Sequence, residues 1–232
     1  MFEAQAQRLH YLLAIDDDQM LYNFREAAGL DKKEAPAMIG WDSPTSKLRG
    51  HTTGHYLSAL ALAYQSTGSE QIFSKLTYMI AELAKVQTAF AADSAIKEGF
   101  LSGYSEEQFD LLEQFAPYPD NWAPYYTLHK LFAGLLDSYH LGGINQALLI
   151  ADKLGDWVYQ RLSRLSHEQL QKMWGMYIAG EYGGMNESLA ELYSYTGKAE
   201  HLKAAQLFDN DRLFFPLKQQ VDALGGLHAN QH

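Results

Sequence analysis

Apolar residues spaced three and four positions apart, interrupted by isolated glycines, constrain the fold of this chain more than any other feature. One apolar stripe runs from Leu57 to Tyr64, and a second runs from Ile72 to Leu83. Between the two stripes, Gly68 suits the left-handed residue that ends a helix, and Ser69 can cap the helix that follows. The pattern therefore predicts an antiparallel helical hairpin centred on Gly68.

The same unit returns twice, with breaks at Gly142-Gly143 and at Gly197. The breaks lie 74 residues apart (68 to 142) and then 55 residues apart (142 to 197). Regular helical solenoids keep a fixed period, so uneven spacing favours hairpins arranged round a ring. We predict an all-α protein: a partial (α/α)6 toroid within a single domain, residues 1–232, with a long loop insert at about 88–123.

Several shorter signals extend this prediction. Apolar spacing predicts helices over residues 4–13, 18–28 and 217–224, and capping boxes at Ser105-x-x-Gln108 and Ser166-x-x-Gln169 predict two further helix starts. Three hairpins do not close a ring of six. We therefore expect one flank of the core to be exposed, and the chain to self-associate or to bind a C-terminal partner through that flank.

Composition excludes several classes of function. The net charge is -10 and Lys and Arg do not cluster, which argues against binding nucleic acid. We find neither a signal peptide nor an apolar run of about 18 residues, so we expect no membrane association and a cytoplasmic location. The sequence has no cysteine, which removes disulfides, thiol catalysis and Cys-ligated zinc from this chain.

Polar side chains recur just before, or at the start of, the first helix of each hairpin, which in a toroid is the end that lines one funnel. They are Trp41, Asp42, Arg49 and His51; then Trp122, Tyr125, Tyr126 and His129; then Glu181, Asn186 and Glu187; and finally His228. This recurrence predicts a binding cleft at that end of the helices.

Two pairs within this set have open interpretations. His51 and His55 share one helix face, and they either bind a metal or serve as ordinary pocket and core residues; no flanking acid completes an H-E-x-x-H motif. Asp42 either bonds backbone amides in its own loop or pairs with Glu187 as the two carboxyl groups of a glycosidase. Sequence spacing alone does not decide between them.

Six motifs that appear in order carry a resemblance to a known family. They are Gly40-Trp41-Asp42, the segment Leu48-Arg49-Gly50-His51-x-x-Gly54-His55-Tyr56-Leu57-Ser58-Ala59, Gly99-Phe100-Leu101-Ser102, the segment Trp122-x-Pro124-Tyr125-Tyr126-Thr127-Leu128-His129-Lys130, Gly183-Gly184-Met185-Asn186-Glu187 and Gly226-Leu227-His228-Ala229-Asn230. Together they resemble glycoside hydrolase family 127, the β-L-arabinofuranosidase-like group. The resemblance covers nearly the whole chain but only the N-terminal part of the family's catalytic domain.

The resemblance implies an (α/α)6 barrel followed by β-sandwich domains, and hydrolysis of β-L-arabinofuranosides with retention of configuration. It also implies a cysteine nucleophile held on zinc by further cysteines and a glutamate, with a second glutamate as acid/base. In the family these residues follow the position of His228, so we expect the catalytic residues downstream of His232 and no cofactor or metal in this chain; zinc is expected only in a full-length relative.

What the resemblance carries over is binding of an arabinose-containing oligosaccharide or glycan. His129 and His228 match histidines that contact the arabinose ring. Trp41, His51, Asn186 and Glu187 match motif positions to which the resemblance gives no defined role, and we include them as candidate substrate-binding residues.

Three functions are therefore open. The first is the N-terminal part of a carbohydrate-active hydrolase, inactive alone because the cysteine and zinc half is absent. The second is a non-catalytic sugar-binding module, and the third is a helical-repeat scaffold whose exposed edge binds a partner. A cleft of His, Trp and Asn or Glu favours the first two, whereas a concave face of ordinary apolar residues favours the third.

Overall fold

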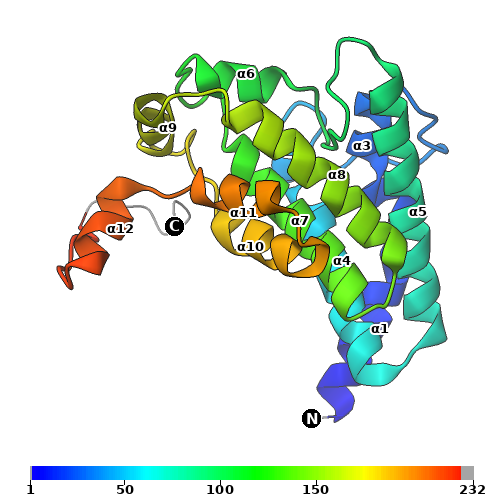
Figure 1. Ribbon diagram of the computed structural model, residues 1–232. Helices are drawn as coiled ribbons and strands as arrows, with labels where there is room; N and C mark the ends of the chain where they lie inside the picture. The colour runs from blue at the N-terminus through cyan, green and yellow to red at the C-terminus, as the bar shows by residue number, and fades with distance from the viewer. Residues whose placement is uncertain (1, 226–232) are drawn as a thin grey trace.

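The computed structural model describes residues 2–225, which form helical hairpins laid side by side (Figure 1). The first hairpin pairs α4 (His51–Thr67) with α5 (Glu70–Ala92), and the second pairs α7 (Pro124–His140) with α8 (Asn145–Leu162). The third pairs α10 (Met185–Thr196) with α11 (Ala199–Gln206). No strand occurs in this part of the chain, so the predicted all-α class and its three hairpins are confirmed.

Glycines end the first helix of each hairpin, or lie just after its end, in the conformation that the sequence indicates. Gly68, Gly143 and Gly197 have φ of 64°, 69° and 68°, in the left-handed region that residues with a Cβ rarely adopt. The Ser69 hydroxyl accepts a hydrogen bond from the backbone N–H of Ile72 at 3.4 Å, which caps α5.

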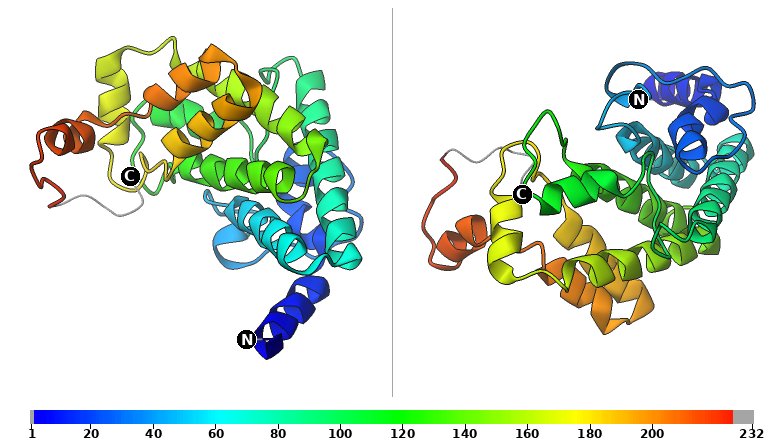
Figure 2. Two further views of the ribbon diagram at one scale, coloured as in Figure 1. Left: turned by 60° about the horizontal axis from the view of Figure 1, so that its bottom comes forward. Right: turned by 90° about the horizontal axis from the view of Figure 1, so that it is seen from above.

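The hairpins form two layers, and α4, α7 and α10 make the inner one. These three helices run parallel, because residues near the start of one helix contact residues near the start of its neighbour, and residues further along contact residues further along. Leu48 contacts Thr127 near the start of α4, and Leu57 lies beside Gly134 further along. Similarly, Gly184 bonds to His129, while the rings of Tyr195 and Tyr139 lie 5.1 Å apart near the other end. The outer helices α5, α8 and α11 return antiparallel to them, a toroid-like arrangement that Figure 2 shows from two further directions.

The inner helices α4 and α7 approach each other through two glycines. A Cβ on Gly134 would lie 2.5 Å from the carbonyl oxygen of Gly54 and 2.8 Å from Cβ of Leu57. A Cβ on Gly54 would overlap the backbone carbonyl of Lys130. The two backbones therefore touch, and the side chains that flank these glycines are brought to a short, fixed separation.

The insert between α5 and α7 starts at residue 93 rather than at about 88, because α5 continues to Ala92. It contains the short helix α6 (Glu107–Glu113) and packs firmly on the core. Phe100 is fully buried, with ring centroids 5.1 Å from Phe90 and 5.0 Å from Trp157. Motif Gly99-Phe100-Leu101-Ser102 is thus a structural anchor of the insert.

The N-terminal segment adds α1 (Phe2–Ala14), α2 (Asp17–Met20) and α3 (Tyr22–Ala27), so the helix predicted over 18–28 is split into two. The carboxylate of Asp16 caps α2. Arg25 on α3 is buried and forms ion pairs with Glu82 at 2.6 Å and with Asp18 at 2.8 Å, which ties this segment to α5.

Of the two predicted capping boxes, one is confirmed and one is wrong. Ser166 caps α9 (His167–Trp174) as its capping box predicts, with the N–H of Gln169 as donor. Ser105 does not cap α6, which starts after Glu106; the Glu106 carboxylate instead accepts a bond from the indole N–H of Trp157.

The last helix is not at 217–224. It is α12 (Asp211–Lys218), which starts where the side chain of Asn210 accepts from the N–H of Arg212. Gln220, two residues after the helix ends, has φ of 57°, which is not a helical conformation. The Asn210 cap and this left-handed residue set the bounds of the helix, and the apolar spacing over 217–224 does not. This helix lies at one edge of the molecule, apart from the hairpins (Figures 1 and 2). Within the described residues, no helix has both the length and the apolar character needed to cross a bilayer.

Candidate functional site

The N-terminal ends of the inner helices surround a cavity of about 200 Å³. Trp41 and His51 line it from the segment before α4 and from the start of α4, and Trp122 and Tyr126 line it from the start of α7. Glu181, just before α10, completes the polar part of the wall. The predicted convergence of pre-helix polar residues therefore exists in the structure. The cavity is below the roughly 300 Å³ of a drug-sized pocket, and we infer that it takes one small ring.

Asp42 positions this wall from beneath. It is buried, and its carboxylate accepts from the backbone N–H of Gly50 at 2.6 Å and from the hydroxyl of Thr52. Its backbone carbonyl accepts from the side-chain amide of Asn23 at 2.7 Å. Of the two interpretations of Asp42, the structure shows the one in which it bonds backbone and side-chain groups around its own loop.

His51 is oriented by the same carboxylate. Its Nδ1 lies 3.0 Å from the carbonyl oxygen of Leu48 and 3.1 Å from Oδ2 of Asp42. Because both neighbours are acceptors, Nδ1 must carry a proton. The ring is therefore held in one orientation, which leaves Nε2 as the nitrogen that can meet a ligand.

His129 lies one helical turn beyond Tyr126 on α7, against the glycines that precede α10. The backbone N–H of Gly184 donates to Nδ1 of His129 at 3.2 Å. A Cβ on Gly183 would lie 2.6 Å from that same nitrogen, so the Gly183-Gly184 pair is required for this close approach. Burial, with smaller contributions from nearby Lys130 and His55, lowers the pKa of His129 to about 3. The ring is therefore neutral near pH 7, and Nε2 carries its proton.

Glu187 stands beside this histidine. A Cβ on Gly184 would lie 2.9 Å from Nε2 of His129 and 3.3 Å from Oε2 of Glu187, so the two groups border the same small space. Glu187 is exposed and occupies the first turn of α10, where the helix dipole favours a carboxylate. An N–H donor and a carboxylate acceptor are thus presented side by side.

His55 and Lys130 complete the electrostatics of the inner face. The ring centroids of His51 and His55 are 6.3 Å apart on α4. Burial lowers the pKa of His55, and Lys130 and His51 lower it further. Burial also lowers the pKa of Lys130, whose ammonium lies 4.5 Å from the centre of the Tyr126 ring. Positive charge on this face is therefore concentrated on α7.

The remaining predicted residues are placed differently. The side-chain amide of Asn186 donates to the carbonyl of Ala205 at 3.1 Å and to Asp209 at 3.0 Å, so its nitrogen holds α10 to α11. A sugar-binding role for Asn186 stays a prediction. His228 lies outside the described residues.

Tyr126 and Glu181 are cavity residues that were not selected as candidate substrate contacts. Both belong to the recurring pre-helix set, and that recurrence is the signal by which they can be found. Both line the cavity. Burial raises the pKa of Tyr126, and the carboxylate of Glu181 raises it further.

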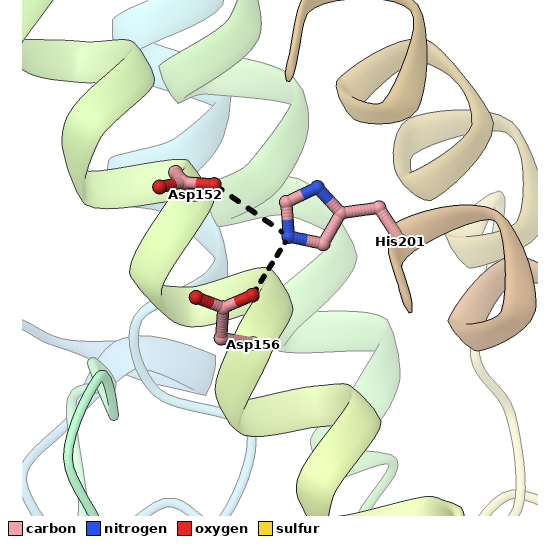
Figure 3. Close-up of side chains that lie close together, drawn as sticks. All are labelled: Asp152, Asp156 and His201. Carbon is pink, nitrogen blue, oxygen red and sulfur yellow. Dashed lines mark hydrogen bonds and ion pairs between the residues drawn. The ribbon is translucent and has the colours of Figure 1, made fainter. Parts of the chain in front are cut away.

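A separate cluster brings together possible metal ligands on the outer layer (Figure 3). Nε2 of His201 lies 3.2 Å from Asp156 and 3.7 Å from Asp152. Lys198, however, lies 2.7 Å from Asp152 and 3.0 Å from Asp156, so an ammonium already pairs with both carboxylates. We interpret the cluster as an ion-pair network that joins α8 to α11.

No match is found among curated proteins. The model of one protein family matches the chain over residues 1–232, and its description is β-L-arabinofuranosidase, GH127 catalytic domain. Among the motifs that carry the resemblance, Trp41, His51 and Trp122 line the cavity, and Gly183-Gly184 receives His129. The chain belongs to the β-L-arabinofuranosidase family of GH127 catalytic domains.

Proposed function

We propose that the inner-helix face binds a β-L-arabinofuranosyl group of an oligosaccharide or glycan, and that residues 1–232 do not hydrolyse it on their own. Family membership supports a carbohydrate ligand. The observation that carries the proposal is the pairing of His129 and Glu187 around Gly184, one helical turn from the cavity that contains His51 and Glu181.

The chemistry of this pair suits a sugar. Neighbouring hydroxyls of a furanose each donate and accept, so a fixed N–H donor beside a carboxylate acceptor can bond two of them at once. His129 is held by the Gly184 N–H, and its neutral state keeps Nε2 as a donor. A neutral donor also avoids the cost of burying a second cation near Lys130.

The residues of this chain do not fit the zinc centre that the family implies. That centre uses thiolates, and the sequence has no cysteine. The cluster of Asp152, Asp156 and His201 has no thiolate, and Lys198 pairs with both of its carboxylates.

Calorimetric titration with methyl β-L-arabinofuranoside tests the binding proposal. We expect binding that is selective over the α-anomer. His129→Gln should weaken it by about tenfold, since one hydrogen bond in a buried site is worth about 1 to 1.5 kcal/mol. His167→Gln, in which an exposed histidine on α9 is changed, is the matched control and should keep the wild-type Kd. Equal Kd values for the wild type and His129→Gln would contradict this site.

Hydrolysis is tested separately with an aryl β-L-arabinofuranoside, with and without added zinc. We expect no turnover above the buffer blank, because general acid–base catalysis alone contributes about 10² to 10⁴-fold and the family's nucleophile is a cysteine. Zinc-dependent release of the aryl group by purified residues 1–232 would show that the inactivity proposal is wrong.

A further inference from the structure

Trp41 is unusually exposed for a tryptophan that has a fixed position. Its side chain is 67% exposed at the rim of the cavity. Trp has a large apolar surface and is normally buried for most of its area, so this placement forgoes hydrophobic stabilisation. An exposed aromatic ring at the edge of a polar cavity indicates a ligand contact, because ligand-binding pockets commonly place aromatic side chains beside a few polar groups.

The surroundings of Trp41 keep its ring in place. Its neighbour Asp42 is buried and bonds to Gly50 and Thr52, so the short turn η1 (Gly40–Asp42), which contains Trp41, is anchored to the start of α4. The Trp122 ring packs against Trp41 at 6.0 Å between centroids, with an interplanar angle of 66°.

The second support of the rim comes from the insert. Tyr118 packs edge-on against Trp122 at 5.3 Å. Lys47 also donates to the backbone carbonyl of Asp120, which joins the segment before α4 to the segment before α7. Little conformational entropy remains to be lost when a ligand stacks on Trp41.

We propose that Trp41 is the stacking platform for a second sugar ring, the one to which the bound β-L-arabinofuranosyl group is attached. This inference rests on the proposed function and extends it from a single sugar to a disaccharide. The arabinosyl group is placed on His129 and Glu187, one helical turn from the cavity, so the adjoining ring of a longer ligand lies toward the mouth of the cavity, which at about 200 Å³ has room for one small ring. Trp41 borders that mouth, together with Trp122, and offers an apolar face to the C–H face of a sugar.

The experiment compares two ligands on the full chain by calorimetry. One is methyl β-L-arabinofuranoside, and the other is a disaccharide in which the β-L-arabinofuranosyl group is linked to a second arabinose. Trp41→Ala should weaken disaccharide binding by about tenfold, the effect of losing an aromatic contact worth about 1.4 kcal/mol, and change the Kd of the monosaccharide less than about twofold. Trp41→Phe should restore most of the disaccharide affinity.

Tyr11→Ala is the matched control, because Tyr11 is 68% exposed on α1 and lies outside the cavity; both of its Kd values should equal those of the wild type. Failure of the wild type to bind either sugar would refute the proposed function itself. Wild-type binding of both sugars with an unchanged disaccharide Kd in Trp41→Ala would refute only the platform.

Discussion

Gly134→Ala should separate the inner helices and thereby disrupt the site. The new Cβ would lie 2.5 Å from the carbonyl oxygen of Gly54, whereas ordinary contacts begin near 3.4 Å, so the backbones must part by about 0.9 Å (3.4 minus 2.5). Overpacking of this kind costs about 1 to 3 kcal/mol, and alanine returns up to about 1 kcal/mol of helix propensity. We take the upper part of that range, because the obstacle is backbone, and expect a net loss of about 2 kcal/mol.

For a chain of this length, that loss corresponds to a fall in Tm of about 4 to 8 °C, measurable by circular dichroism. The separation would also move His51 and His55 on α4 away from His129 on α7. In an enzyme, a displacement of about 1 Å in the groups that position the substrate can lower the rate by about 10²-fold. We therefore expect the Kd for methyl β-L-arabinofuranoside to rise at least tenfold.

Gly68→Ala is the control. Gly68 has positive φ, but no other atom lies within 4 Å of the position that an alanine Cβ would take there. This variant should therefore lose about 1 kcal/mol to backbone strain and keep its affinity for the sugar. The reasoning is refuted if Gly134→Ala is as stable as the wild type and binds the sugar equally well.

Three further predictions concern stability and association. Burial alone would raise the pKa of Glu82, but hydrogen bonds from Lys85 and Arg25 lower it to about 2; Glu82→Gln should therefore cost about 3 kcal/mol in urea unfolding at neutral pH, and an unchanged midpoint would contradict this. The pKa of His129 is lowered, so the unfolded chain binds the proton first as the pH falls. Between about pH 7.5 and pH 5, the free energy of unfolding of the wild type should therefore fall by about 2 kcal/mol more than that of His129→Gln. Equal falls in the two proteins would contradict the buried, neutral histidine. Leu62 is 54% exposed in an open groove of about 1010 Å³ between α1 and α4, so light scattering at tens of micromolar should show self-association; a stable monomer that binds no hydrophobic dye would mean that this flank is closed.

The hairpins could be predicted from the sequence because their signals are local. Gly68 and Ser69 end one helix and cap the next through contacts within a few residues, and the structure shows both. The helix predicted at 217–224 failed for the same kind of reason: Asn210 and Gln220 set the bounds of α12 locally, and apolar spacing alone does not register a cap or a left-handed residue.

The site could be predicted only in part. Recurrence before each first helix identified the end of the molecule where the cavity lies, but it does not say which side chains face that cavity. Asn186 and Glu181 illustrate this: the amide of Asn186 bonds toward α11, whereas Glu181 lines the cavity. The requirement for glycine at position 54 could not be predicted from the local sequence either, because the backbone that it contacts, at Lys130, lies 76 positions later (130 minus 54).

The three inner helices start at the cavity and end at the glycine turns, so binding and chain reversal occur at opposite ends of each hairpin. The turns at Gly68, Gly143 and Gly197 have open space around them. An affinity tag, a fluorophore or a surface linker placed in one of these turns is therefore about a full helix length, roughly 25 Å for the 17 residues of α4 at 1.5 Å each, from the cavity end. The fold thus offers attachment points for immobilising the chain at the end opposite the proposed sugar site.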